Sequence, residues 1–460
     1  MSETLERATF QGAPAEVRTR PRAGVILAAG RSERLARVTG GGSKALVRVG
    51  GLSLVERAVR SLLAAGIERV IVVVGYQAGP VAAVVNRIAP GRVRAAYAER
   101  WEEGNGASLA AAAPLLEDGD DLFVLVTADH VFGEGVVERL VAEGRPAVLV
   151  DHAPDPDAWA EGTRVRLRED GAVAFSKELG DPAIDCGAFL LPRAVFGAQR
   201  RAAARGDGTL AGAVTELAAE RPLAAVPLPP GTWWQDVDTP EDLRRARERL
   251  RRSLIKPGDG PVSRYLNRPI STRISMLLAP LRPSPDLVSM LAFLLGLAAS
   301  WLLAEGRSVW AAVLVHLTSI LDGVDGEVAR LQLRASAGGA LLDGVLDRLC
   351  DAAIVLGLAS WALAAGTEPR TVLALAVAAA VGSMLSMATK DRIAALGLPP
   401  APERGLGYLL GGRDGRLLLV ALAALAGRPV WALAAVTVTS GLSLFLRVLL
   451  ARFWASRLEA

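Results

Sequence analysis

The sequence predicts two joined folds, an α/β doubly wound (Rossmann-like) domain and an all-α domain of six transmembrane helices. Two patterns predict them: short apolar runs alternate with helical stretches over residues 23–254, and long apolar runs separated by short Arg-bearing loops follow from Pro285. A third observation is length, because 460 residues exceed what one hydrophobic core usually serves. We therefore expect a soluble part and a membrane part in one chain.

Composition divides the chain into four expected segments. Residues 1–22 carry arginines but no apolar stretch of the kind found in signal peptides, so they are expected to be a flexible lead-in. Residues 23–254 form the α/β domain. Residues 255–284 hold a linker with Pro and Gly and then arginines among apolar residues, which indicates an amphipathic helix lying in the membrane interface. Residues 285–460 form the transmembrane domain.

Four apolar runs predict buried parallel strands: Gly24–Ala29, Val70–Gly75, Leu122–Thr127 and Ala147–Val150. The patterns between them predict helices over Leu54–Ala65 and Gly135–Ala142. Thr239 is a good N-cap, Pro240 suits the first helical position and Asp242 is an acid three residues after the cap, so a closing helix is expected to end near Leu254. In such folds ligands bind at the carboxyl ends of the strands.

Six apolar stretches are expected to span the membrane: Leu287–Leu303, Ser308–Leu321, Leu341–Ala365, Val372–Thr389, Leu417–Ala426 and Pro429–Leu450. The second is short, but it can continue as one helix beyond the membrane. Basic residues gather between the fourth and fifth stretches. By the positive-inside rule, this loop, both termini and the α/β domain are expected on the cytoplasmic side of the cell membrane.

Charge and cysteine content exclude several classes of protein. The net charge is only +4, and the basic residues lie beside apolar runs instead of forming a stripe with aromatic residues, so no nucleic-acid partner is expected. Cys186 and Cys350 lie in different expected domains without metal-ligand spacing. Neither a zinc site nor a disulfide framework is expected, and a reducing compartment fits.

The first candidate site begins at the loop that follows the first strand. Residues 24–35 read GVILAAGRSERL, a strand that ends in small residues and opens toward a helix, and Lys44 follows. Small residues let backbone amides approach phosphates, and a helix start favours anions. Arg34 and Lys44 can neutralise a triphosphate. An ordinary strand-to-helix turn is the alternative, and the full spacing argues against it.

Two carboxylates are expected to complete this site. Asp129 follows the strand that ends at Thr127, and Asp238 directly precedes the capped helix. Together they can hold a Mg²⁺ ion between the α-phosphate of a nucleotide and the leaving pyrophosphate. As alternatives, Asp129 is a turn residue and Asp238 supports the helix cap.

These motifs resemble those of the nucleotidyltransferases that activate sugar and alcohol phosphates, a group that includes the molybdenum-cofactor guanylyltransferase-like domains. The resemblance covers residues 24–250. It implies catalysis by Lys44 and Arg34, metal binding by Asp129 and Asp238, and nucleotide binding by Leu27, Ala28, Ala29, Gly30, Lys44, Asn105, Ser108 and Asp129. It also implies acceptor binding by Lys177 and Asp185, for which an exposed charge and a polar strand residue are the alternatives. The expected metal is Mg²⁺ or Mn²⁺.

The second candidate site consists of four aspartates in apolar sequence. Asp322 and Asp325 are three residues apart, and Asp343 and Asp347 are four apart, so each pair shares one face of a helix. Carboxylates inside membrane-spanning segments are costly and indicate function. Two helices can bring all four together, and such a cluster demands metal.

With Gly326, Ala329, Arg330 and Gly339, this spacing resembles the CDP-alcohol phosphotransferase family over about residues 261–450. The resemblance implies that the four aspartates hold two divalent ions, that Asp347 deprotonates the acceptor hydroxyl, and that CMP leaves. It also implies that Gly326 and Ala329 leave room for the cytidine nucleotide and that Arg330 meets its phosphate. A phosphorylated acceptor can bind to loop arginines, although positive-inside arginines would look the same: Arg404, Arg413 and Arg416.

A nucleotidyltransferase joined to a CDP-alcohol phosphotransferase resembles the bifunctional inositol-1-phosphate cytidylyltransferase and di-myo-inositol-phosphate-phosphate synthase family. The resemblance implies that CTP and inositol 1-phosphate give CDP-inositol, which reacts with a second inositol 1-phosphate to give the phosphorylated di-inositol solute. A homodimer through the transmembrane domain in the lipid bilayer is also implied. Three alternatives stay open: a phospholipid synthase with a lipid acceptor, an enzyme for another alcohol phosphate, and a nucleotide sensor without catalysis.

Overall fold

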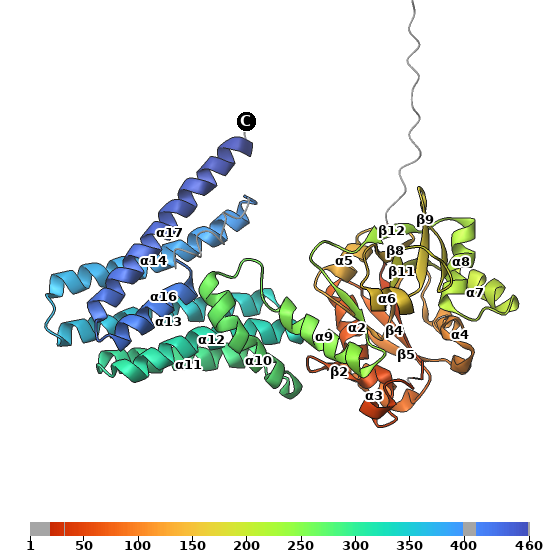
Figure 1. The fold of residues 1–460 in the computed structure, drawn as a ribbon, viewed down its shortest axis with the longest axis horizontal. Helices are drawn as coiled ribbons and strands as arrows, with labels where there is room; N and C mark the ends of the chain where they lie inside the picture. The colour runs from red at the N-terminus through yellow and green to blue at the C-terminus, as the bar shows by residue number, and fades with distance from the viewer. Residues whose placement is uncertain (1–18, 32, 399–410, 459–460) are drawn as a thin grey trace, which may run out of the picture. The chain divides into compact units, whose positions relative to one another are not determined.

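The computed structural model describes residues 19–31, 33–398 and 411–458 (Figure 1). The chain divides into two compact units, residues 1–49 with 53–247 and residues 50–52 with 248–460. Helix α9 (Pro240–Ser253) crosses this division. The boundary expected after residue 254 falls at the end of this helix and stays a prediction.

The first unit is built around a nine-stranded sheet with the path β10-β9-β11-β6-β1-β4-β5. Its centre consists of four parallel strands, β6 (Leu122–Thr127), β1 (Ala23–Ala28), β4 (Arg69–Val74) and β5 (Val93–Tyr97). The remaining strands of the sheet are β8 (Ala147–Asp151), β9 (Arg164–Arg168), β10 (Gly171–Ser176), β11 (Ile184–Pro192) and β12 (Ala224–Pro227). The four strands expected from the sequence are confirmed to within a residue at each end.

Helices cover both faces of this sheet. One apolar core joins alternate residues of β1 to α2 (Leu54–Ala64), α3 (Ala78–Ile88) and α5 (Val136–Val141). A second core joins the intervening residues to α4 (Asn105–Ala110), α7 (Val195–Ala204) and α8 (Leu210–Glu220). The unit also contains the short helices α1 (Ala36–Thr39) and α6 (Pro156–Glu161). This arrangement confirms the doubly wound, Rossmann-like class.

The sheet is mixed, whereas the apolar runs alone suggested a parallel one. Strand β11 runs antiparallel to both β6 and β8. Strand β11 also runs antiparallel to β9. It therefore runs against each of the three strands with which it pairs in the described sheet.

Two small pairings set the positions of acidic segments. Strand β13 (Trp234–Asp236) pairs antiparallel with β7 (His130–Phe132), so Asp236 lies opposite His130. Strands β2 (Arg48–Val49) and β3 (Leu52–Ser53) form another pair. The cap expected before α9 is present: the amide of Asp242 donates to Thr239 Oγ1 at 3.2 Å, and the amide of Thr239 donates to Asp242 Oδ2 at 2.9 Å.

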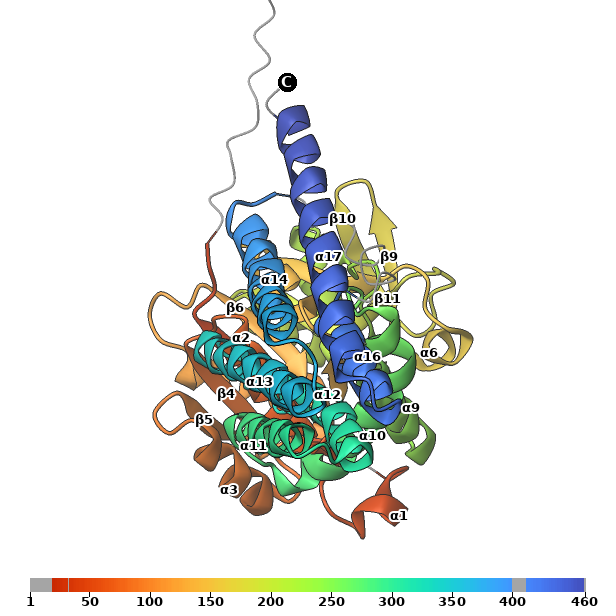
Figure 2. The ribbon, with the colours of Figure 1, turned by 90° about the vertical axis from the view of Figure 1, so that its left-hand side faces the viewer.

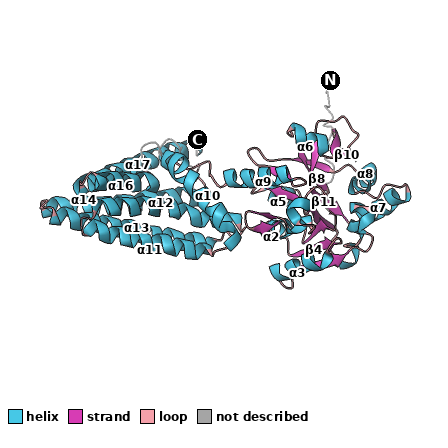
Figure 3. Cartoon of the chain, turned by 60° about the horizontal axis from the view of Figure 1, so that its bottom comes forward, coloured by secondary structure: helices cyan, strands magenta, loops and turns pink. Residues whose placement is uncertain are grey.

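From Pro261 onward the described residues form helices and loops only (Figure 3). A π-helical turn, Ser263–Asn267, leads into α10 (Arg268–Leu278). The longer helices are α11 (Pro285–Ala304), α12 (Ser308–Leu331), α13 (Ala337–Ala364), α14 (Pro369–Ala395), α16 (Arg413–Leu425) and α17 (Pro429–Leu458). Figure 2 shows α11, α12 and α13 side by side. These six helices match the six expected spans in place and order.

Four of these helices are long and apolar enough to cross a membrane, among the described residues: α11, α12, α14 and α17 through Arg457. Helix α13 contains four charged residues, Asp343, Asp347, Arg348 and Asp351, and α16 has only 13 residues. The chain is a membrane protein, and that α13 and α16 also span the bilayer stays a prediction. Helix α12 continues to Leu331, as the sequence suggested for the second span.

Helix α10 turns its polar side inward. Ser271, Thr272 and Ser275 are almost completely buried, whereas Ile270 and Leu277 are exposed. In water this would be an unfavourable arrangement, but an apolar outer face suits lipid. The expected placement of this segment in the membrane interface stays a prediction that this polarity supports.

Candidate active sites

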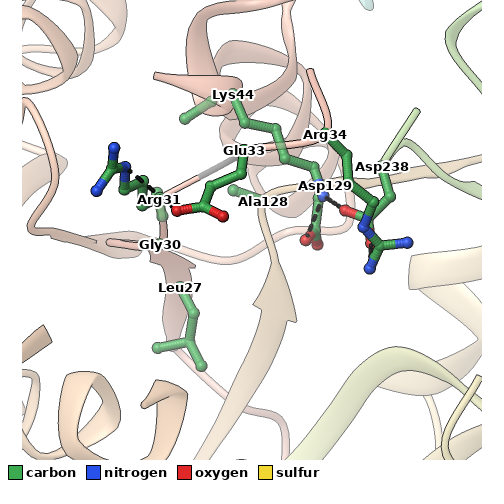
Figure 4. Close-up of a pocket in the computed structure, with 11 residues that line it drawn as sticks. Leu27, Gly30, Arg31, Glu33, Arg34, Lys44, Ala128, Asp129 and Asp238 are labelled. Atoms are coloured by element: carbon green, nitrogen blue, oxygen red, sulfur yellow. Dashed lines mark hydrogen bonds and ion pairs between the residues drawn. The ribbon is translucent and has the colours of Figure 1, made fainter. Parts of the chain in front are cut away.

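The first site lies at the carboxyl ends of β1 and β6, where sequence analysis placed it. A cavity of about 400 Å³ is lined there by Leu27, Ala28, Gly30, Arg31, Glu33, Arg34, Lys44, Ala45, Ala128, Asp129 and Asp238 (Figure 4). Leu27 and Ala28 end β1, and Asp129 comes two residues after β6. No side chain obstructs the loop at Gly30, because an added Cβ there would meet nothing within 4 Å.

Lys44 is the cation at the centre of this site. Its Nζ lies 2.9 Å from Asp129 Oδ2, donates to Asp238 Oδ1, and lies 3.7 Å from Asp236 Oδ1. Only 11% of its side chain is exposed. Burial disfavours the charged amine, but the three carboxylates outweigh it and raise the pKa of Lys44. Lys44 therefore stays charged and holds together two segments that are far apart in sequence.

Arg34 is far more exposed than Lys44: 56% of its side chain is accessible to solvent. Its Nη1 donates to Glu161 Oε2 at 2.7 Å, and its Nη2 lies 3.2 Å from Asp238 Oδ2. The carboxylate of Asp238 thus contacts both cations of the site, Lys44 and Arg34, whereas Thr239 and Asp242 form the cap of α9. The alternative of a cap-supporting Asp238 side chain does not describe this geometry.

His130 forms a second cluster with Asp129 and Asp236. Their candidate ligand atoms all lie within 4.8 Å of one another. The ring of His130 stacks on Trp234, with centroids 5.4 Å apart, and Nδ1 lies 2.8 Å from Asp129 Oδ1. Sequence analysis named Asp238 for this site but not Asp236. The pairing of β7 with β13 brings Asp236 to this cluster. Strands this short leave no pattern in the sequence from which their pairing could be predicted.

Burial and charge act in opposite directions on these three groups. Burial disfavours the imidazolium, but Asp236, Asp129 and Asp185 outweigh it and raise the pKa of His130 to about 9. Burial also raises the pKa of Asp236 to about 6, with Asp129 adding repulsion against the attraction of His130 and Lys44. Despite its burial, Asp129 keeps a pKa well below the ordinary value because Lys44 and His130 lie beside it.

Other expected nucleotide-binding residues lie outside this cavity. Ala29 is buried, Asn105 Oδ1 accepts from the amide of Leu210 at 2.7 Å, and Ser108 Oγ donates to the carbonyl of Gly104 at 3.2 Å. The base-binding role of Asn105 and Ser108 stays a prediction.

The two expected acceptor residues differ in their surroundings. Lys177 is exposed just beyond β10. Asp185 lies in β11 and accepts from the amide of Gly187 at 2.9 Å, and its burial raises its pKa. Asp185 is close enough to His130 to influence it electrostatically, which places it on the side of the first site.

The second site is formed by α12 and α13, as the spacing of the aspartates predicts. Asp322, Asp343 and Asp347 offer oxygens that all lie within 4.8 Å of one another. Asp325 lines the same small cavity, and it accepts hydrogen bonds from Ser289 Oγ and from the amide of Gly326. The structure thus brings the four aspartates together.

Arg413 lies inside this carboxylate centre. Its Nη1 contacts Asp322 and lies 2.9 Å from Asp347 Oδ1, and its Nε donates to Asp351 Oδ1 at 3.0 Å. Arg416 Nη2 donates to Asp351 Oδ2 at 3.3 Å. Both arginines were expected in a loop, and this placement is wrong: α16 begins at Arg413, where buried acids neutralise both charges. Arg404 lies outside the described residues.

Asp351 was missed by sequence analysis. It follows Asp347 by four residues and therefore continues the face that carries Asp343 and Asp347. The spacing could have revealed it, but the family motif ends at Asp347. In the structure it anchors the two arginines of α16.

The motif residues expected at the nucleotide lie on α12 and its end. A Cβ at Gly326 would come within 3.3 Å of Arg330 Nη1, so this glycine leaves room beside Arg330. Arg330 Nη2 donates to the carbonyl of Leu254 at 3.2 Å, and Ala329 is half-buried. Their roles in nucleotide binding stay predictions.

Both sites have the donor set that a divalent metal requires. Carboxylate oxygens are the preferred protein ligands of Mg²⁺ and Mn²⁺, and each site gathers several of them within 4.8 Å. In both, a cation of the chain itself, Lys44 or Arg413, lies against these oxygens. The residues therefore fit a divalent metal, whose identity the donors alone do not select.

Known families match both units. The sequence model described as a MobA-like NTP transferase domain matches residues 24–226, and the model described as CDP-alcohol phosphatidyltransferase matches residues 283–408. A Rubrobacter xylanophilus protein named bifunctional IPC transferase and DIPP synthase is 41% identical, over 91% of this chain and 94% of its own length. The chain belongs to this family.

The chain is also similar to a second curated relative and to a solved structure. The bifunctional IPC transferase and DIPP synthase of Thermococcus kodakarensis is 34% identical over 87% of this chain and 90% of its own length. Among solved structures, the inositol-1-phosphate CTP transferase from T. maritima matches 50% of this chain and 96% of its own, with 24% identity and a TM-score of 0.44. As a member of the bifunctional family, the chain is an enzyme with a nucleotidyltransferase unit and a CDP-alcohol phosphotransferase unit.

Proposed function

We propose that this enzyme makes a phosphorylated di-inositol solute in two steps. In the first, an oxygen of inositol 1-phosphate attacks the α-phosphorus of CTP, so that CDP-inositol forms and pyrophosphate leaves. In the second, a hydroxyl of another inositol 1-phosphate attacks the phosphorus that carries inositol in CDP-inositol, and CMP leaves. The observation that carries this proposal is the match to bifunctional relatives over both units, with the residues of both sites in place.

In the first step the chain positions and neutralises phosphates. Lys44 and Arg34 are directed at the cavity beside Gly30, so they can exchange their carboxylate partners for the oxygens of the triphosphate (Figure 4). Asp129 and Asp238 would hold Mg²⁺, which supplies a positive charge for the developing pyrophosphate. Lys177 and Asp185 are proposed to contact the inositol phosphate. No covalent intermediate is required.

In the second step Asp347 is proposed to take the proton of the attacking hydroxyl. Asp322, Asp325, Asp343 and Asp347 would hold divalent ions, which neutralise the diphosphate of CDP-inositol. Arg413 must then leave Asp322 and Asp347, and its anchor on Asp351 keeps it next to the centre. A freed guanidinium in this place can bind the phosphate of the incoming inositol 1-phosphate bidentately. Arg416 is held by the same anchor.

We further propose that both termini, the first unit and the segment between α14 and α16 lie in the cytoplasm. Basic residues favour the cytoplasmic side, and five lie in or beside this segment: Lys390, Arg392, Arg404, Arg413 and Arg416. A homodimer through the transmembrane helices completes the proposal. Helices α11, α14 and α17 expose large apolar side chains, which is consistent with contacts to lipid or to a second copy of the chain.

The test is a two-product assay on the full chain in detergent. The protein is incubated with Mg²⁺, CTP and inositol 1-phosphate, and pyrophosphate, CMP and phosphorus-containing products are followed by mass spectrometry and NMR. Asp343→Asn is assayed beside it, with Glu305→Gln as a matched control, because Glu305 is an exposed acid at the end of α11. We expect pyrophosphate, CMP and a di-inositol product from the unsubstituted enzyme and the control, and CDP-inositol accumulating with Asp343→Asn.

Three other outcomes would redirect the proposal. Pyrophosphate without CMP would leave the first step standing and point to a lipid acceptor, which added phospholipid precursors would then reveal. No pyrophosphate with inositol 1-phosphate would reject the inositol assignment, and other alcohol phosphates would be tried. CTP binding without any turnover would favour a sensor.

A further inference from the structure

Glu327 is a fully buried acid within the motif of the second site, at a position to which the motif assigns no role. Its exposed fraction is 0%. Glutamate is almost never fully buried unless it is paired, because burying a charge is costly. Three donors satisfy it: Arg268 Nη1 and Ser271 Oγ donate to Oε1, each at 2.7 Å, and Ser275 Oγ donates to Oε2 at 2.6 Å. All three donors come from α10.

The same cluster reaches the linker before α10. Asp259 accepts from Arg268 Nε at 2.9 Å and from Nη2 at 3.2 Å, so Arg268 lies between two acids. We call Glu327, Arg268, Ser271, Ser275 and Asp259 the Glu327 cluster. It fixes α10 to α12 through charged and hydrogen-bonded contacts, and its members Glu327, Ser271 and Ser275 are almost completely buried.

The cluster also touches the backbone of α12 beside an active-site aspartate. Arg268 Nη1 donates to the carbonyl of Gly323 at 3.3 Å, and a Cβ added to Gly323 would lie 2.6 Å from this nitrogen. Gly323 directly follows Asp322. A glycine is therefore required here for Arg268 to reach both Gly323 and Glu327.

Helix geometry separates the cluster from the metal-facing side. Successive residues of an α-helix are rotated by about 100°, so Glu327 points roughly 140° away from Asp322 and roughly 160° away from Asp325. On one side of α12, Asp322 approaches Asp343 and Asp347 of α13. On the side that carries Glu327, α10 packs against α12. An anchor on the far side fixes the rotation and depth of α12, and with them the direction of both aspartates.

We propose that Glu327 is a positioning residue of the second reaction, which acts through α12 to hold Asp322 and Asp325 in the geometry that binds divalent metal. The inference rests on the proposed second step. It predicts that metal binding weakens about 10- to 100-fold when the contacts of Glu327 with α10 are lost. An effect of this size is typical when residues that orient metal ligands are substituted.

The test measures metal binding apart from turnover. Asp129→Asn and Asp238→Asn are introduced into the full chain to remove the first metal site, and Mn²⁺ binding is followed by EPR of the free ion. Glu327→Gln keeps the shape of the side chain and removes its charge. Ser271→Ala with Ser275→Ala removes two donors and leaves all charges in place, and Glu305→Gln is the control. In chains with an intact first site, CMP release from added CDP-inositol and inositol 1-phosphate is measured against Mg²⁺ concentration.

We expect the dissociation constant for Mn²⁺ and the half-saturating Mg²⁺ concentration to rise about 10-fold or more in Glu327→Gln, and in the same direction in the double serine variant, with no change in the control. If Glu327→Gln fails to fold, the double serine variant decides. Unchanged Mn²⁺ binding in the variants overturns the proposal, even if CMP release falls. If the unsubstituted chain binds Mn²⁺ but releases no CMP, the proposed second step fails, while the shift in Mn²⁺ binding still decides the role of Glu327.

Discussion

The two sites of this enzyme use the same kinds of group in opposite surroundings. The first lies in a cavity of about 400 Å³ at the ends of strands, with Arg34 largely exposed. The second lies between helices, and its arginine, Arg413, is only 9% exposed. Loops after strands supply the first set of acids, whereas helix faces supply the second.

This difference shows how each setting controls its charges. In the open site, water and mobile side chains can screen the acids, and one buried lysine suffices to link them. In the membrane unit, unpaired carboxylates would be very costly, and Arg413 contacts three of them: Asp322, Asp347 and Asp351. We therefore expect a substitution of a catalytic residue to reduce activity more in the second site than in the first.

The largest effect is expected from Asp347→Asn. It removes both the proposed base and a metal ligand, so CMP release should fall about 10³-fold, while pyrophosphate release from the first site stays unchanged. Separate assays with CTP and with CDP-inositol measure the two steps in one preparation. A parallel loss of pyrophosphate release would mean that the two sites are not independent.

Lys44→Ala should affect the opposite step. Without the buried cation, pyrophosphate release should fall about 10²-fold, and CMP release from added CDP-inositol should not change. Arg87→Ala is the control, because Arg87 is an exposed cation on α3 of the same unit. A loss smaller than that of Arg34→Ala would show that the exposed arginine, and not the buried lysine, carries the charge compensation.

The stability of the first unit should depend on pH through His130. Its pKa is raised from the ordinary value of 6.5 to about 9 in the folded protein. The stabilisation is therefore fully present below pH 6.5 and is lost as the pH rises through 9, by about 3 kcal/mol. Pulse proteolysis in urea with a chelator present would measure it. The pH dependence should flatten in His130→Gln, and an unchanged profile in that variant would contradict this origin.

The smallest effect is expected from Asp351→Asn. It weakens the anchor of Arg413 and Arg416 but leaves the metal ligands, so the half-saturating concentration of inositol 1-phosphate in the second step should rise about 10-fold with little change in kcat. Steady-state kinetics with CDP-inositol held at saturation would measure it. A fall in kcat alone would place these arginines elsewhere in the reaction.

The sequence revealed the second site more completely than the first. Asp322, Asp325, Asp343 and Asp347 follow helical periodicity, which fixes their direction once the helices are recognised. Asp236 depended on the pairing of two three-residue strands from distant segments, and local patterns carry no information on such contacts. The fold class was predictable because apolar runs mark strands. The reversal of β11 was not, because it is set by pairings with β6 and β8 that local patterns do not reveal.

The surroundings of Arg413 and of α10 also could not be predicted from the sequence. Arginines beside apolar runs predict a loop at the membrane surface, and only the position of their acidic partners shows that they belong to a helix in the site. Likewise, the mixture of apolar residues and arginines in 262–281 predicts an amphipathic helix, but not that its polar side is the buried one. Both outcomes are set by partners that lie far away in the sequence.

The length of α12 determines how deep the second reaction takes place. Asp322 comes 14 residues after the start of α12 at Ser308, which at 1.5 Å per residue is about 21 Å along the helix axis. A hydrocarbon layer is about 30 Å thick, so a helix that starts at one surface brings its first aspartate to about 9 Å short of the other. A water-soluble nucleotide thus needs only a shallow, one-sided recess to reach the acids. Charged substrates and products can enter and leave without crossing the bilayer.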